Sequence, residues 1–270
     1  MLTREPQPED GARGKPRPNA SIEFWTEFRP EVARLHQART PLYYLGQRSA
    51  VPALACLHQY AIKGFADGVR YETRLAWSRG ARRSDILDVL SIAFLHSGHV
   101  GMYPATTVAP LLREYAGPPP AGTPFPRNWA FERGAFSSGM DFSRPRASEA
   151  DLDALDDWYA RTIGEVPRHV QFLRRNRPEL LKAHRNRYEH AISESLPKQM
   201  LPYLLLHYDI YRGFAGGIRE NLLLARACGL TRGQVLDAIC SSVLHAGAAG
   251  LNLVDSAGGD ILAAWPPDDD

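Results

Sequence analysis

The stretch GFADGVRYETRLAWSRG, residues 64–80, returns as GFAGGIRENLLLARACG at residues 213–229. The match extends in both directions. When the chain is shifted by 149 positions, residues 58–101 align with 207–250, and 16 of the 44 pairs are identical. With a one-residue slip, FRPEVARLH at 28–36 also matches NRPELLKAH at 176–184. So long a match at one offset indicates that the chain is an internal duplication.

Both copies have the periodicity of helices. Apolar residues in 51–80 recur at spacings of three and four, which predicts one long helix ending at Gly80, a natural helix stop. A second helix is predicted from about Ser84 to Gly98, and its counterpart begins at TRGQ (231–234), which has the form of a capping box. Strand-type alternation is almost absent. The sequence therefore predicts an all-α fold.

Further helices are predicted around 22–47 and 168–195, one before each hairpin, and another over 149–163, where Ser148 and Asp151 form a capping box. The connection between the copies is rich in Pro, Gly and Ser but contains Trp129 and Phe136, so we expect it to pack on the surface as a strap, with a lid as the alternative. The predicted parts are a disordered leader (1–20), a first repeat (21–115), the connection (116–147), a second repeat (148–262) and a solvated acidic tail (263–270).

Composition excludes several classes of partner. Hydrophobic residues make up 44% of the chain, charged residues 23%, and the net charge is +2, too small to indicate binding to nucleic acid or to an anionic membrane. No apolar run approaches the length of a transmembrane helix, and the first residues lack the apolar stretch of a secretory signal. The three cysteines form no CxxC pair, and their odd number makes a disulfide framework unlikely, so we expect a reducing, cytoplasmic location.

A carboxylate stands out within the first repeat. On a single helix over 51–80, His58, Phe65 and Glu72 would share one face with apolar residues, and a buried carboxylate is costly unless it is paired. Its counterpart is Asn221, which carries no charge, so the first copy is predicted to hold the ionisable group. The structural alternative is an ion pair of Glu72 with an arginine, for which the candidates are Arg70, Arg74 and Arg83.

Histidines are the other candidates. His96 and His99 lie one helical turn apart, a spacing that suits acid–base work near neutral pH or, with Glu72, a metal site. The second copy keeps His245 but replaces the other histidine with Ala248. His58 recurs as His207, and Arg70 as Arg219. A guanidinium at that position can grip a carboxylate or simply lie on a solvated face.

These residues resemble the carboxymuconolactone decarboxylase family, which includes the AhpD-like proteins. The resemblance rests on ETRLAWSRG (72–80) with FLHSG (94–98), and on NLLLARACG (221–229) with VLHAG (243–247). It implies two tandem AhpD-like helical repeats that form an intrachain pseudo-dimer, and a homo-oligomer, a dimer or trimer. Glu72 and Asn221 stand where the family has histidine, and His96 and His245 at its tyrosine-like position. Phe65, Gly68, Phe214 and Gly217 occupy the positions of the CxxC pair, so thiol peroxidase chemistry is not expected.

The resemblance implies a lyase such as a decarboxylase, or an isomerase, that acts by acid–base chemistry on a small carboxylate- or lactone-bearing substrate. No G-x-G-x-x-G motif or phosphate loop is present, so no cofactor is predicted. The alternatives are a metal-dependent enzyme using His96, His99 and Glu72, and a non-catalytic binding or assembly protein. The predicted catalytic residues are Glu72, His96 and His99, and the predicted substrate-binding residues are Arg70, His58, Phe65, His207 and His245.

Overall fold

The computed structural model describes residues 20–39, 49–132, 134–191, 195–266 and 268. Within these ranges the chain forms helices and no β-strand, so the predicted all-α class is confirmed. The predicted leader lies outside the described residues, except that Ala20 begins the first helix.

The helices divide at the connection into two sets. The first set is α1 (Ala20–Phe28), α2 (Pro30–Arg39), α3 (Val51–Lys63), α4 (Ala66–Ser78), α5 (Arg83–Ser97), α6 (His99–Ala105), the 3-10 helix η2 (Thr106–Val108) and α7 (Ala109–Glu114). The second set is α8 (Glu149–Ile163), α9 (Arg168–Asn176), α10 (Pro178–Ala191), α11 (Met200–Arg212), α12 (Ala215–Ala227), α13 (Arg232–Ala246) and α14 (Ala248–Ala263).

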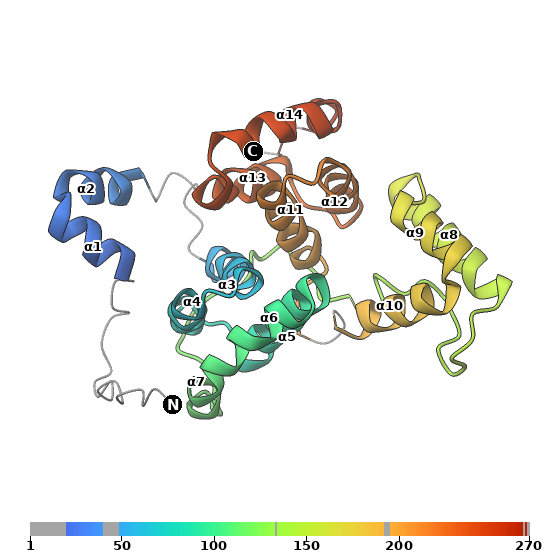
Figure 1. Cartoon of the computed structure of the whole chain (residues 1–270), viewed down its shortest axis with the longest axis horizontal. Helices are drawn as coiled ribbons and strands as arrows, with labels where there is room; N and C mark the ends of the chain where they lie inside the picture. The colour runs from blue at the N-terminus through green and yellow to red at the C-terminus, as the bar shows by residue number, and fades with distance from the viewer. Residues whose placement is uncertain (1–19, 40–48, 133, 192–194, 267, 269–270) are drawn as a thin grey trace, which may run out of the picture.

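The duplicated segments have the same helix boundaries. α3, α4 and α5 each begin and end 149 residues before α11, α12 and α13. The counterpart of α14 is split into α6, η2 and α7, where Pro104 and Pro110 remove backbone donors. α3 packs on α4 and α5 as α11 packs on α12 and α13, and α3 and α11 meet between the two sets (Figure 1).

The prediction of one long helix over 51–80 is wrong. The helix stops at Gly64, whose left-handed φ of 74° reverses the chain, and its N–H donates to the carbonyls of Ala61 and Tyr60. α4 then starts at Ala66. Gly213 ends α11 in the same way, with φ of 69°. His58 and Glu72 therefore lie on different helices, and the shared face predicted for them does not exist.

The other helix boundaries agree better with prediction. Ser148 and Asp151 form a capping box at the start of α8, and Thr231 and Gln234 form one at the start of α13, both as predicted. The segments predicted around 22–47 and 168–195 are each two helices, because a proline, Pro30 or Pro178, disfavours helix at the residue before it. Residues 40–48 and 192–194, at the ends of these segments, lie outside the described residues.

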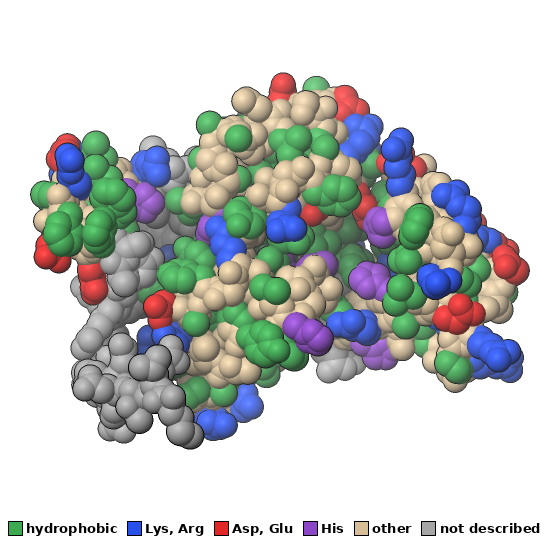
Figure 2. Space-filling view, in the orientation of Figure 1, with side chains coloured by type: hydrophobic (Ala, Val, Ile, Leu, Met, Phe, Trp, Pro, Cys, Tyr) green, Lys and Arg blue, Asp and Glu red, His purple; other side chains and the backbone are tan. Residues whose placement is uncertain are grey.

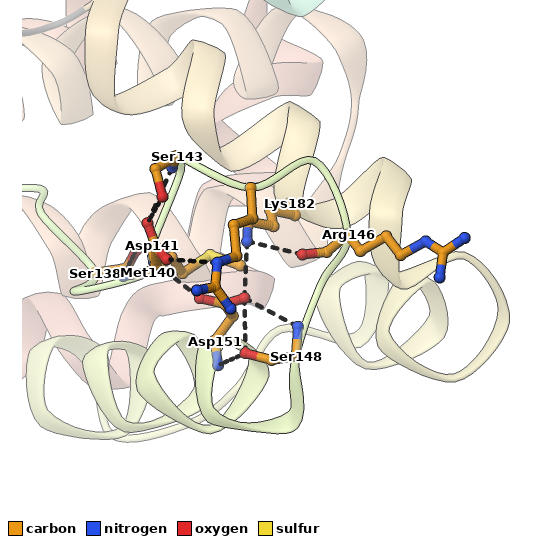
Figure 3. Close-up of polar contacts among 9 residues, drawn as sticks. Ser138, Met140, Asp141, Ser143, Arg146, Ser148, Asp151 and Lys182 are labelled. Carbon is orange, nitrogen blue, oxygen red and sulfur yellow. Dashed lines mark hydrogen bonds and ion pairs between the residues drawn. The ribbon is translucent and has the colours of Figure 1, made fainter.

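The connection packs on the helices as a strap. Trp129 and Phe136 are buried, and the backbone N–H of Ala130 donates to the side chain of Gln199 at 3.0 Å. Figure 3 shows the second anchor, where the buried ammonium of Lys182 on α10 donates to Asp151 Oδ2 at 2.8 Å and to the carbonyl of Arg146 at 2.9 Å. Asp151 Oδ1 also accepts from the N–H of Asp141 at 2.8 Å. One buried ion pair thus fixes the strap to α8 and α10.

The main hydrophobic core spans both sets of helices, from Leu54 and Ile86 in the first to Leu204 and Ile218 in the second. A smaller cluster, with Met140, Leu155 and Val170 among its members, packs the strap on α8, α9 and α10. The tail over 263–270 was predicted to be solvated, and this prediction is only partly correct. Trp265 is buried within the core, and Asp268 accepts a hydrogen bond from the N–H of Gly233 at 2.8 Å, while residues 267, 269 and 270 lie outside the described residues. In the described part of the chain, no helix combines the length and apolarity needed to cross a membrane.

Candidate active site at the junction of the two halves

Four histidines gather where α3 meets α11. His58 and His207 occupy equivalent positions of these two helices, and neither has any exposed surface. Their helices place them inward because the neighbouring residues on that face are apolar, among them Leu54 and Leu204. Both residues were predicted to line the site, and the structure brings them to the junction between the halves.

Each inner histidine contacts an outer one from the same half. The ring centroids of His58 and His96 are 5.7 Å apart, and those of His207 and His245 are 5.3 Å apart. The outer rings stand near the ends of α5 and α13 and are half-buried. His207 is also among the causes of the lowered pKa of His58, so the two pairs are close enough to interact. We call the four rings the histidine row.

Each pair of histidines also contacts a tyrosine of the opposite half. The ring of Tyr208, on α11, lies 6.1 Å from His58 and 6.2 Å from His96. The ring of Tyr60, on α3, lies 5.2 Å from His245. Neither end of the histidine row is therefore complete without both halves of the chain.

All four histidines are uncharged at neutral pH. Burial is the largest cause in each case, because a low-dielectric environment disfavours the imidazolium. It lowers the pKa of His96 to about 3, that of His207 to about 4 and that of His245 to about 2. The pKa of His58 lies well below its usual value, through burial and then through His96 and His207. The row is a set of neutral imidazoles.

Several ring nitrogens of the row have no partner within the described residues. Both nitrogens of His58 are buried without a hydrogen bond, as is Nδ1 of His96 and of His245. A neutral imidazole always carries one N–H donor, and a buried donor without an acceptor is costly. Such groups in a folded protein call for an explanation, and a bound substrate is one.

Glu72 lies beside Tyr60 rather than beside His96. It is only 7% exposed, and burial raises its pKa to about 8, with Arg79 acting in the opposite direction. Burial raises the pKa of the Tyr60 phenol, and the nearby Cys56 and Glu72 raise it further. Among the described residues, no hydrogen bond, ion pair or ring contact joins Glu72 to His96. The predicted Glu72–His96 pair is therefore not assembled.

The second half has a buried carboxylate of its own, which the sequence prediction missed. Asp209 is 6% exposed, and burial raises its pKa to about 7, while a 2.8 Å hydrogen bond from Asn221 opposes the shift. In the repeat alignment Asp209 matches Tyr60, and Asn221 matches Glu72. Each half thus has one buried carboxyl in this pair of matching positions. In the first half it is Glu72, on the second helix of the hairpin (α4), and in the second half it is Asp209, on the first helix (α11). Reading the two positions as a pair, rather than Glu72 alone, could have found it.

Besides Glu72, three predicted site residues lie outside the histidine row. Gly98 breaks the helix between His96 and His99, so His99 begins α6 and is exposed. Arg70 forms an ion pair with Asp67 on the surface of α4, which is the solvated alternative considered for it. Phe65 is 40% exposed, and its ring packs 5.3 Å from that of Tyr60.

The metal alternative is not assembled by the fold. His99 and Glu72 lie away from His96, for the reasons given above. Across the described ranges, no group of three or more His, Cys, Asp or Glu side chains is placed to hold a metal ion. The site that the geometry supports is the histidine row with its two tyrosines.

Known proteins add no identification to this geometry. Searches against protein-family models and against curated proteins find no match for the chain. The resemblance to the carboxymuconolactone decarboxylase family therefore stays a prediction from the motifs.

Proposed function

We propose that the chain is a cofactor-independent acid–base enzyme of the lyase or isomerase type, acting on a small carboxylate- or lactone-bearing substrate at the histidine row. Its two AhpD-like repeats then act as an intrachain pseudo-dimer, with the row at the internal interface. The observation that carries this proposal is the inner histidine His58, which is fully buried and whose two ring nitrogens have no hydrogen-bond partner among the described residues.

The chemistry follows from the state of these rings. Decarboxylation, lactone opening and isomerisation all develop negative charge on a carbonyl or carboxyl oxygen. Fixed N–H donors in a site without bulk water stabilise such charge strongly. A neutral imidazole supplies that donor. A bound anion beside a half-buried outer ring such as His96 would raise the pKa of that ring toward the range in which it can exchange protons with water.

The test is a substrate panel of β-keto acids, unsaturated lactones and 2-oxo acids in deuterated water, followed by NMR for carbon dioxide loss, ring opening and deuterium incorporation. We expect wild-type protein to turn over one class. His96→Gln should lower that rate by about 10²–10⁴-fold. His99→Gln is the matched control on the exposed α6 and should leave the rate unchanged. Equal rates for wild type and His96→Gln would remove the histidine row from the mechanism.

A second proposal, association between copies of the chain, rests on repeated apolar positions at the surface. We call the helix pairs α1–α2 and α9–α10 the two arms of the chain. Phe24 and Phe172 are 51% and 57% exposed, and they match each other when the two arms are aligned with the one-residue slip. Val32 and Leu180, exposed to 46% and 56%, also match. Figure 2 shows how hydrophobic side chains cover much of the α1–α2 arm on the viewed face. Exposed apolar patches of this kind mark surfaces that contact between copies of the chain can bury.

A further inference from the structure

The two ends of the histidine row differ in their nearest cation. Lys63 is the last residue of α3, and its Nζ lies 4.1 Å from the ring centroid of Tyr211 on α11. Lys63 lies one helical turn beyond Tyr60, whose ring is 5.2 Å from that of His245, so the two side chains share a face of α3. After burial, the charge of Lys63 is also a cause of the lowered pKa of His207 and of His245. The matching residue, Arg212, is exposed.

The ammonium of Lys63 has no counter-ion in the described structure. Its side chain is half-buried, and burial lowers its pKa. Neither a salt bridge nor a hydrogen bond ties its Nζ to any described residue; its ammonium lies over the ring of Tyr211, and Cys56 is the other group that acts on its pKa. Removing an ammonium from water without pairing it is unfavourable. A bound anion would reverse that cost.

The surroundings of Lys63 suit one small anion. His245 presents a buried Nδ1 without a partner, and its ring is 5.2 Å from Tyr60. The rings of Tyr60 and Tyr211 are the flat apolar surfaces beside His245 and Lys63. One lysine with neutral imidazoles matches a single negative charge. A phosphate dianion would need more donors than this group contains.

We propose that Lys63, His207 and His245 form a carboxylate-binding subsite, whose walls of Tyr60 and Tyr211 favour a planar, unsaturated or aromatic acid. This assignment rests on the proposed function only in equating the bound anion with the substrate carboxylate. It also places the bound carboxylate beside His207 and His245 of the second half, whereas the sequence predicted that the first half is the active one.

The test uses full-length protein labelled with ¹⁵N-histidine and titrated with sodium benzoate, with sodium chloride keeping the ionic strength constant. Ring resonances are assigned through His207→Gln and His245→Gln. We expect saturable shifts of the His207 and His245 signals. Lys63→Met should weaken benzoate binding about tenfold or more, whereas Lys63→Arg should retain it. Arg212→Met, the matched change at the other end, should bind as the wild type does.

The proposal is overturned if Lys63→Met, folded as judged by unchanged ring dispersion without benzoate, binds benzoate as tightly as the wild type. It is also overturned if benzoate shifts no histidine signal, or only those of His58 and His96. The result is independent of turnover. Benzoate binding at Lys63 without activity on the substrate panel would sustain the subsite and contradict the enzymatic proposal. Activity lost in His96→Gln with no benzoate effect would do the reverse.

Discussion

The rings of Tyr60 and His245 lie 5.2 Å apart although the two residues come from different halves of the chain. Tyr60 in turn lies close to Glu72, whose carboxyl has a pKa of about 8 because it is buried. The most unusual carboxyl of the first half is therefore connected, through one tyrosine, to the histidines of the second. Each end of the histidine row therefore contains residues from both halves. Because the two halves are on one chain, the two ends of the row can differ in sequence.

Replacing the inner histidine separates function from stability. His58→Leu exchanges a buried, unpartnered imidazole for an apolar side chain, which removes a penalty of about 1–3 kcal/mol. We expect the free energy of unfolding at pH 7, from urea denaturation, to be unchanged or higher while activity is lost. A variant less stable than the wild type by more than about 2 kcal/mol would instead indicate that His58 holds the core together.

The advantage of His58→Leu should grow in acid. The folded pKa of His58 lies below its ordinary value near 6.5, so the unfolded chain binds more protons between those values. The contribution of His58 to the free energy of unfolding of the wild type is therefore largest above pH 6.5. It decreases as the pH falls, by at most about 1.4 kcal/mol per pH unit. Urea curves at pH 5, 6 and 7 measure the difference. His99→Leu, at an exposed position, should track the wild type.

Two adjacent glycines in the first turns of α12 give a matched pair of substitutions. A Cβ at Gly217 would collide with the carboxylate of Asp209, whereas one at Gly216 would meet only the exposed ring of Phe214 at 3.3 Å. Gly217→Ala should break the Asp209–Asn221 hydrogen bond and lower the free energy of unfolding by about 1–3 kcal/mol. Gly216→Ala should be neutral or stabilising by about 0.5–1 kcal/mol, from the backbone entropy of glycine. Equal effects in thermal unfolding would contradict this account.

The sequence predicted the all-α class and two capping boxes correctly because both depend on local patterns. The capping boxes at Ser148 and Thr231 and the recurrence of His58 as His207 needed no tertiary information. The break at Gly64 was missed because the apolar spacing continues through it, although a left-handed glycine reverses the direction of the chain. That error put Glu72 on the wrong helix face.

The partners across the junction could not be predicted in the same way. Nothing local indicates that Tyr60 meets His245, or that Lys63 meets Tyr211, because these contacts depend on how α3 crosses α11. The pairing of His96 with His99 failed because of one residue, Gly98, whose backbone ends α5 and separates the two side chains.

Association of the chain should depend on the repeated apolar positions. If Phe24 and Phe172 contribute to equivalent interfaces, Phe24→Glu and Phe172→Glu together should lower the molar mass in sedimentation equilibrium to that of one 30.1 kDa chain. Tyr103→Glu is the control, because Tyr103 is 67% exposed but matches Asn252 in the repeat. A wild-type protein that is already monomeric at all concentrations would contradict the proposal of association.

Glu72 should make the protein less stable as the pH rises. Its folded pKa of about 8 exceeds the ordinary value of 4.5, so between those values the folded protein binds more protons than the unfolded chain. The stability from the neutral carboxyl is complete below about pH 4.5 and decreases toward pH 8, by at most about 1.4 kcal/mol per pH unit. Glu72→Gln remains uncharged throughout this range.

The advantage of Glu72→Gln in the free energy of unfolding should therefore increase from pH 5 to pH 8 and level off above it. Glu179→Gln, an exposed carboxylate on α10, serves as the control and should give a curve parallel to the wild type. Parallel curves for Glu72→Gln as well would show that the Glu72 carboxyl is already ionised in the folded protein near pH 5. In that case the carboxylate would need a counter-charge, and Arg79, the cation that acts on it, would be the first to replace.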